Sequence, residues 1–188
     1  MMKQIQMQKL MKEIQECKKC FLWKTRNIPL IGDGNIDANI MFIGEAPGYY
    51  EDLKGKAFVG NAGKIFDQLL EIAKLKRSQI YITNILKCHP PKNKDPTSDS
   101  IKHCIKYLFV QLKIVKPKII VTLGKYATKE LFLRVKIPFT KISDIHGSVF
   151  KIKSSYGMVK LIAMYHPSSA CHNPFLLSIL KEDMKKCF

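Results

Sequence analysis

Four of the six cysteines have a spacing suited to binding a metal centre. Cys17 and Cys20 form a C-x2-C pair, which lets two thiolates converge on one metal. Sixty-seven residues separate Cys20 from Cys88, and 15 residues separate Cys88 from Cys104. Because structural zinc commonly uses two local pairs, this irregular spacing favours an iron–sulfur cluster. Buried free thiols are the alternative that needs no metal.

Two further segments carry polar groups suited to recognising an organic ligand. Asn84 offers both an acceptor and a donor to the edge of a base. His166 is a titratable donor, and the hydroxyls of Ser168 and Ser169 follow it directly. Each residue also has a purely structural interpretation, because Asn commonly caps a turn and a lone His is often structural.

The segment Gly44–Gly48 and the aromatic residue Phe58 are weaker candidates. Two glycines in Gly44-Glu45-Ala46-Pro47-Gly48 permit a tight turn with backbone close to a ligand. The segment lacks the G-x-G-x-x-G spacing of dinucleotide sites and the Gly-Lys-Ser/Thr of a P-loop, so both functions are excluded. Phe58 is interpreted either as a core residue or as a stacking platform.

The elements that would position these residues alternate along the chain. Four short apolar runs rich in β-branched residues are typical of buried parallel strands: Asn39–Ile43, Ile80–Ile85, Lys118–Leu123 and Leu161–Tyr165. Helix-like stretches precede, separate and follow them: Gln4–Glu16, Ala62–Leu75, Ser98–Val115, Lys125–Arg134 and Pro174–Lys186. A short extra hairpin is predicted around Ser148–Ile152.

This alternation predicts an α/β fold, and 188 residues fit one domain that spans positions 1–188. Ligands in open α/β sheets bind beyond the carboxyl ends of the strands. Four segments lie at such ends: Gly44–Gly48, Asn84–Pro91, Gly124–Lys125 and His166–Ala170. The candidate polar residues are therefore expected to gather at one edge of the sheet.

Charge and apolar content restrict the class of partner and the compartment. Lys and Arg number 32 against 15 Asp and Glu, for a net charge of +17, which favours a polyanion such as DNA or RNA. No run approaches the roughly 18 apolar residues of a membrane span, and lysines interrupt the amino terminus. We therefore expect a cytoplasmic protein without a membrane partner, in which disulfides are rare. Cys171 and Cys187 are expected to be free thiols.

In their order along the chain, these motifs closely resemble the family 4 uracil-DNA glycosylases. The resemblance covers about Cys17–Lys186, and the combination is specific although no single part is. The motifs are Cys17-x-x-Cys20, Gly44–Gly48 with Glu51-Asp52, Gly55-Lys56-Ala57-Phe58-Val59-Gly60, Thr83-Asn84-Ile85-Leu86-Lys87-Cys88, Asp95-Pro96-Thr97, Cys104 and His166-Pro167-Ser168.

The resemblance implies a fold, a cofactor and a reaction. The fold is a single domain with a central four-stranded parallel sheet flanked by helices. The cofactor is a 4Fe–4S cluster on Cys17, Cys20, Cys88 and Cys104. The reaction is hydrolysis of the N-glycosidic bond of deoxyuridine in DNA, which releases uracil, leaves an abasic site and initiates base excision repair. The enzyme would be monofunctional, because no lysine matches a nucleophile position.

The resemblance also implies roles for the residues at the strand ends. Phe58 would stack on the flipped base, and Asn84 would pair with uracil O4 and N3–H. His166 is the candidate donor to uracil O2, with help from the backbone around Glu45 and Ala46. The loop Ser168–His172 corresponds to the segment that contacts DNA in the minor groove, so Pro167, Ser168 and Ser169 are assigned to DNA binding.

The chain departs from the family 1 enzymes at two positions in the Gly44–Gly48 segment. Family 1 places an aspartate where Ala46 stands and a tyrosine where Gly48 stands. The water-activating carboxylate is therefore absent from its usual place, and Glu45 and Glu51 are the alternatives. Glu51 is also expected to fill the space near base C5 beside Gly48. The Cys88–Thr97 segment lacks the Arg- and His-rich loop of a related branch that traps its product covalently, so turnover is implied.

Two other functions are compatible with the motifs taken singly. One is a non-catalytic nucleic-acid-binding protein that a cysteine-bound metal stabilises, and the other is a hydrolase of free nucleotides. For the glycosylase we expect a monomer that acts on uracil-containing DNA. A sliding clamp and an abasic endonuclease are the candidate protein partners.

Overall fold

The computed structural model describes residues 2–188 as alternating strands and helices. The strands are β1 (Asp33–Gly34), β2 (Ile40–Gly44), β3 (Ile80–Asn84), β4 (Ile119–Leu123), β5 (Val149–Ser154) and β6 (Gly157–Met164). The helices are α1 (Met2–Gln15), α2 (Tyr49–Lys54), α3 (Asn61–Ile72), α4 (Ser98–Val115), α5 (Lys125–Val135), α6 (Ile142–Ile145), α7 (Pro167–His172) and α8 (Pro174–Cys187). Each predicted strand and helix is present, with small shifts at the ends.

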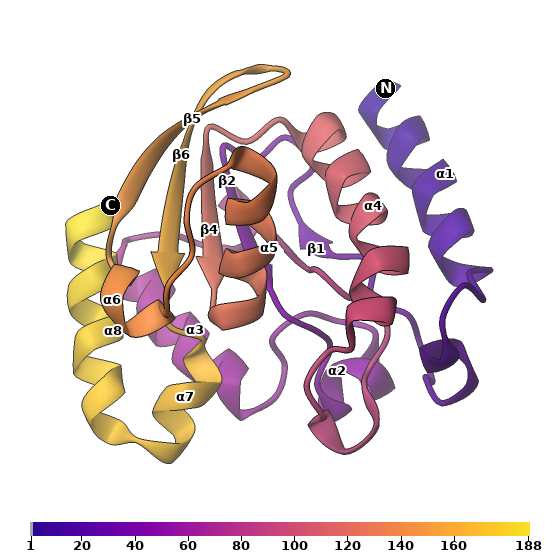
Figure 1. Cartoon of the computed structure of the whole chain (residues 1–188), viewed down its shortest axis with the longest axis horizontal. Helices are drawn as coiled ribbons and strands as arrows, with labels where there is room; N and C mark the ends of the chain where they lie inside the picture. Colours follow the sequence, from indigo (N-terminus) through magenta and orange to yellow (C-terminus); the bar gives the residue numbers. More distant parts are fainter. Residues whose placement is uncertain (1) are drawn as a thin grey trace.

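The sheet has six strands in the order β1-β3-β2-β4-β6-β5 (Figure 1). The central four strands are parallel, which confirms the predicted core of the sheet. The sheet is wider than these four predicted strands, because β1 and β5 pair antiparallel at the two edges. Strand β1 has two residues, too few to show an alternating pattern. The predicted hairpin is formed by β5 and β6, so β6 begins at Gly157, before the predicted Leu161.

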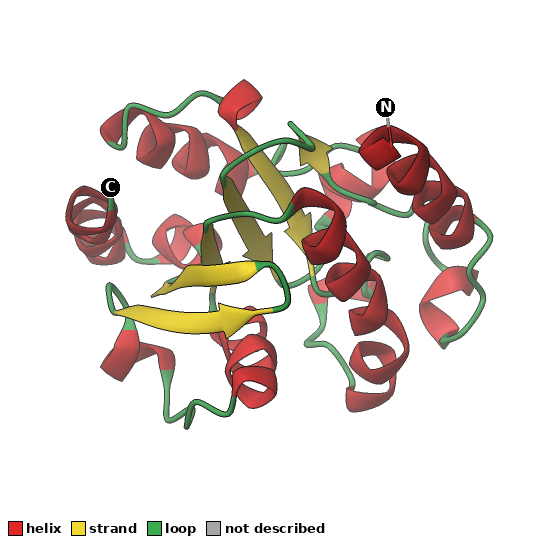
Figure 2. Cartoon of the chain, turned by 90° about the horizontal axis from the view of Figure 1, so that it is seen from above, coloured by secondary structure: helices red, strands yellow, loops and turns green. Residues whose placement is uncertain are grey.

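Helices cover both faces of the sheet (Figure 2). In β2, Met41 and Ile43 belong to a hydrophobic core with residues of α1, α4 and α5, whereas Phe42 belongs to a second core with residues of α3 and α8. Successive residues of a strand point to opposite faces. Because both faces are buried, the strands have continuous apolar sequences.

Capping residues mark the ends of the long helices, whereas the sequence pattern did not predict the short helices. The Thr97 side chain accepts a hydrogen bond from Ser100 N at the start of α4. At the start of α8, Asn173 accepts one from Phe175 N and Pro174 occupies the first turn, where both residue types are favoured. Helices α2, α6 and α7 have six residues or fewer, too few for a helical apolar repeat. Within residues 2–188, no helix has the length and apolar character that a membrane crossing requires.

Candidate active site

A cavity of about 470 Å³ opens where the four parallel strands end. All four predicted segments contribute to its wall, because the carboxyl ends of parallel strands meet at one edge of the sheet. Its volume is in the range of small-molecule sites. The predicted residues that line it are Glu45, Ala46, Gly48, Glu51, Phe58, Asn84, His166 and Ser168.

Asn84 lies at the end of β3, directly beside Gly44 at the end of β2. A Cβ atom at position 44 would collide with Asn84 Oδ1, so the close approach of these two residues requires glycine. The backbone carbonyl of Asn84 accepts a hydrogen bond of 2.7 Å from Lys87 Nζ. Lys87 is buried and also donates to Thr83 Oγ1 and to Gln111 Oε1, each at 2.6 Å. Lys87 therefore fixes the backbone of Asn84 and, with it, the position of the Asn84 side-chain amide.

Phe58 is buried in the cavity wall and has a left-handed backbone, with φ of 52°. Its ring stacks on Phe66 of α3 at a centroid distance of 4.6 Å and 28°. The imidazole of His166 lies near-parallel to the same ring, at 5.8 Å and 26°. Phe58 therefore belongs to the core, as one of its two interpretations predicted, and its ring also lines the cavity. Its stacking on a base stays a prediction.

Glu51 of α2 supports the segment that carries Phe58. Its Oε1 accepts hydrogen bonds from Val59 N at 2.8 Å and from Gly60 N at 3.0 Å. A Cβ atom at position 48 would lie 2.5 Å from Glu51 Oε2. The carboxylate thus occupies the space beside Gly48. Its place near C5 of a bound base stays a prediction.

His166 is the N-cap residue of α7, and its capping contacts determine its tautomer. Nδ1 accepts a hydrogen bond from Ser168 N at 3.1 Å and lies 2.7 Å from Ser168 Oγ. A ring nitrogen that accepts from a backbone N–H carries no proton, so the neutral ring is protonated on Nε2. Burial lowers the pKa of His166 to about 4, and the negative charge of Glu51 opposes this shift. At neutral pH the ring is an uncharged N–H donor.

Glu45 and Ala46 follow β2 and continue its pairing with the chain after β3. The carbonyls of Gly44 and Glu45 accept hydrogen bonds from Ile85 N at 3.0 Å and Leu86 N at 2.9 Å. Burial raises the pKa of the Glu45 carboxyl to about 7; the charge of Asp95 adds to this shift and that of Lys125 opposes it. A carboxyl with a pKa near 7 suits a role that requires a base at neutral pH.

The segment predicted to be a DNA-binding loop is the short helix α7, so the prediction of a loop there is wrong. Pro167 occupies its first turn and is buried. Ser168 lines the cavity, and both serines bond to the histidine: Ser168 to Nδ1, and Ser169 Oγ to the carbonyl at 2.6 Å. His166 itself caps this helix, because its side chain accepts from one of the first free N–H groups, that of Ser168.

The four predicted cysteine ligands line one cavity beside α1 and α4. Cys17 and Cys20 are partly buried, whereas Cys88 and Cys104 are buried. Arg26 Nη1 donates to Cys88 Sγ at 3.1 Å, and Lys87 N donates to Cys104 Sγ at 3.2 Å. Burial raises the pKa of both of these thiols, that of Cys104 to about 12. Among residues 2–188, no three His, Cys, Asp or Glu side chains are placed to hold a single metal ion.

The sequence analysis did not identify two residues whose hydrogen bonds fix backbone segments of the cavity wall. His89 Nδ1 lies 2.9 Å from the Pro47 carbonyl and fixes the segment after β2. Its position directly after Cys88, in the segment that follows β3, could have indicated a role near the cavity. Arg77 bonds to the backbone of Ala57 and Phe58, and no local pattern in the sequence indicates this.

Comparison with known proteins identifies the family. Residues 31–188 match the uracil DNA glycosylase superfamily. The chain is 44% identical over 181 residues to the type-4 uracil-DNA glycosylase of Sulfurisphaera tokodaii, covering 96% of this chain and 82% of that protein. It is 43% identical over 177 residues to the type-4 enzyme of Archaeoglobus fulgidus, covering 94% and 89%. A type-5 enzyme of Pyrobaculum aerophilum is 28% identical over 161 residues, covering 78% and 68%. The chain therefore belongs to the type-4 family of the uracil DNA glycosylase superfamily.

Proposed function

We propose that this chain is a monofunctional uracil-DNA glycosylase, a single domain over residues 1–188 that hydrolyses the N-glycosidic bond of deoxyuridine in DNA. The observation that carries the proposal is the meeting of Phe58, Asn84 and His166 at one cavity. These side chains supply an aromatic face, an amide and a neutral N–H donor. The type-4 relatives are named for the same activity.

The substrate is uracil-containing DNA, and the base must leave the helix to enter the cavity. Extruding a base costs a few kcal/mol, and less at a mismatch, so U·G should open more easily than U·A. Stacking on Phe58 offsets part of this cost. The net charge of +17 attracts the phosphate backbone. Helix α7 carries the three residues assigned to DNA binding: Ser168 lines the cavity, Ser169 follows it, and the buried Pro167 occupies the first turn of the helix.

Asn84 selects uracil over cytosine by the pattern of its amide. The amide group donates to O4 and accepts from N3–H of uracil, whereas cytosine presents an amino donor and a bare N3. A buried polar group left without its partner costs about 1–3 kcal/mol, so the mismatch disfavours cytosine strongly. Glu51 beside Gly48 occupies the place of a thymine methyl group and excludes that base.

His166 stabilises the negative charge that grows on uracil O2 as the glycosidic bond breaks. Its Nε2–H is the free donor of a ring whose Nδ1 is committed to Ser168 N. A donor fixed in advance costs no reorganisation during the reaction. The backbone at Glu45 and Ala46 lines the same cavity and assists.

Glu45 is the better of the two candidates for positioning water and stabilising the sugar cation. Glu51 Oε1 is already bonded to two backbone N–H groups, so Glu51 has a bracing role. Glu45 lines the cavity and has a pKa of about 7, so a large fraction is ionised at neutral pH. It thus takes the role that the aspartate at position 46 fills in family 1.

The residues around the cysteine cavity fit a 4Fe–4S cluster. Ligands of such a cluster surround a space, one thiolate at each iron, and four cysteines line this cavity. Donors to the sulfur atoms of Cys88 and Cys104 stabilise them as thiolates. Bound there, the cluster would supply a structural link between α1, α4 and the sheet and no step of base excision.

A uracil-containing oligonucleotide tests the proposed function. We expect free uracil and an intact abasic strand that breaks only after alkali, and no release from the matching cytosine strand. Asn84→Asp should sharply reduce uracil release and admit some cytosine, because a protonated carboxyl can donate to N3. Binding without base release would support a non-catalytic nucleic-acid-binding protein, and activity on deoxyuridine monophosphate alone would support a nucleotide hydrolase.

His166→Ala should lower the single-turnover rate by roughly 10²–10³ while uracil-DNA affinity changes much less. Because His166 caps α7, His166→Asn is the matched variant, since Asn retains a capping oxygen but loses Nε2–H. A wild-type rate with weakened DNA binding in His166→Ala would assign this residue to DNA contact.

Glu45 should produce a rise of the single-turnover rate with pH, centred near 7, that Glu45→Gln abolishes. The same residue should affect stability in the opposite direction. Its folded pKa exceeds the unfolded value of 4.5, so stability is lost as the pH rises from 4.5 through 7. Urea unfolding should therefore show Glu45→Gln more stable than wild type at pH 8 and equal to it below pH 4.5. An unchanged rate profile would remove the role of Glu45 in water activation.

Protein purified without oxygen should be brown and contain about four irons per chain. Cys88→Ser and Cys104→Ser should each reduce the iron content and the stability to heat, whereas Cys171→Ser, at an exposed position, should change neither. Iron analysis and the visible absorption spectrum are the measurements. One zinc per chain without iron would contradict the cluster.

A further inference from the structure

The backbone of Phe58 adopts a conformation that it does not favour by itself. Its φ of 52° lies in the left-handed region, which is costly for a bulky side chain. Gly63 lies so close to the same residue that a Cβ atom there would collide with the Phe58 carbonyl oxygen. Surrounding groups must therefore hold Phe58 in place.

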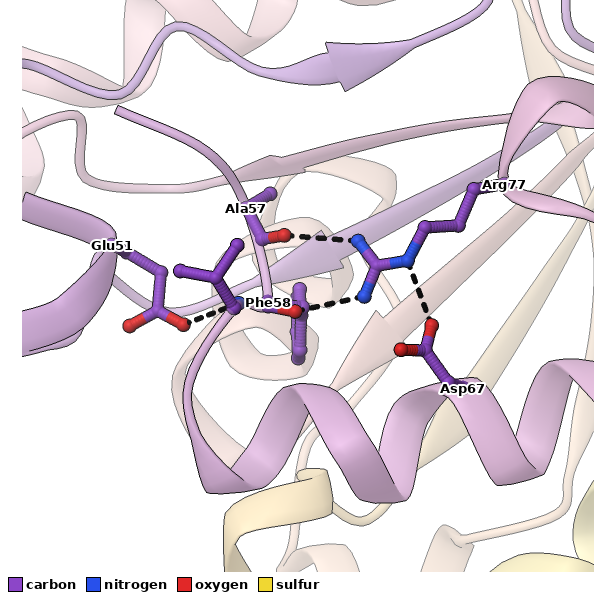
Figure 3. Close-up of polar contacts among 6 residues, drawn as sticks. Glu51, Ala57, Phe58, Asp67 and Arg77 are labelled. Carbon is purple, nitrogen blue, oxygen red and sulfur yellow. Dashed lines mark hydrogen bonds and ion pairs between the residues drawn. The ribbon is translucent and has the colours of Figure 1, made fainter. Parts of the chain in front are cut away.

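Two charged side chains hold the segment 57–60 from opposite sides (Figure 3). Arg77 Nη1 donates to the Ala57 carbonyl at 3.0 Å, and Nη2 donates to the Phe58 carbonyl at 2.8 Å. Glu51 Oε1 accepts from the two N–H groups that follow. The cation thus binds the carbonyls and the carboxylate binds the N–H groups, so each charge stabilises the left-handed turn.

The guanidinium group of Arg77 is itself fixed. Its Nε donates to Asp67 Oδ1 of α3 at 2.7 Å (Figure 3). The central carbon of the guanidinium lies 5.8 Å from the centroid of the Phe66 ring. Phe66 is the ring on which Phe58 stacks. Arg77 therefore contacts both the backbone of Phe58 and the aromatic ring beneath it, in a planar arrangement that Lys cannot reproduce.

We propose that Arg77 is a positioning residue for base recognition, which holds the Phe58 ring at the angle that the extruded uracil requires. This inference rests on the proposed function, in which Phe58 stacks on the base. Arg77 starts the 3-10 turn before β3 (Arg77–Gln79) and acts on the substrate only through Phe58.

Because Arg77 is partly exposed, its effect on base binding can be distinguished from its effect on folding stability. Its side chain is 35% exposed, so water can reach the carbonyl oxygens when the guanidinium is removed. The loss of folding stability should therefore be modest. Base stacking depends on ring placement, and a misplacement of about 1 Å can cost about 10²-fold in rate. Loss of Arg77 should therefore affect uracil binding more than unfolding.

The test compares three variants by inhibition with free uracil and by the KM and kcat for uracil DNA. Arg77→Met should weaken uracil inhibition and raise KM by about tenfold, the scale of one base-stacking contact. Arg77→Lys should be intermediate, because an ammonium group cannot bridge both carbonyls. Arg134→Met is the matched control, since Arg134 forms an ion pair of equal length with Glu130 at similar exposure and does not contact Phe58.

Phe58→Leu separates the failure of this inference from the failure of the proposed function. If Phe58→Leu leaves uracil inhibition unchanged, the stacking role is wrong and the inference falls with it. If Phe58→Leu weakens inhibition but folded Arg77→Met does not, only the inference is overturned. If Arg77 acts through Phe58, the double variant should bind uracil no more weakly than Phe58→Leu alone. Circular dichroism and iron content establish that each variant is folded.

Discussion

The parallel pairing of β2 with β3 is the constraint on which the rest of the site depends. It places Gly44 beside Asn84 at the end of the two strands, with no room for a side chain on the glycine. Because β4 and β6 run in the same direction, Gly124 and His166 arrive at the same edge. A shift of one residue between β2 and β3 would turn the Asn84 amide away from the cavity. The cavity thus follows from strand direction and register.

Burial disfavours a charge on two of the titratable side chains that line the cavity, His166 and Glu45. It lowers the pKa of His166 and raises that of Glu45, because either charge is disfavoured away from water. A neutral imidazole can therefore donate to a developing negative charge without itself carrying a buried charge. The excess of Lys and Arg acts at longer range, where it favours the approach of DNA.

Lys87 connects the cysteine cavity with the candidate active site. Its backbone N–H donates to Cys104 Sγ, and its side-chain Nζ donates to the backbone carbonyl of Asn84. Arg26 connects the cysteine cavity with α1, because it donates to Cys88 Sγ and to the Gln15 carbonyl at the end of that helix. A group held by the cysteines would thereby stabilise the segment that carries Asn84, although it lies outside the cavity for the base.

The sequence by itself determined the α/β class, the central parallel strands, the long helices and the candidate residues at the strand ends. These depend on short-range patterns: apolar runs, caps such as Asn173, and strand ends that must meet in a parallel sheet. Only the tertiary structure decided the antiparallel edge strand β1, the helical form of α7, the tautomer of His166 and the hydrogen bonds from Arg77 to the Phe58 segment. Each of these depends on contacts between segments distant in sequence, or on the hydrogen-bond geometry of one short turn. A local pattern of residue types predicts neither the contacts between distant segments nor the hydrogen-bond geometry of a single turn.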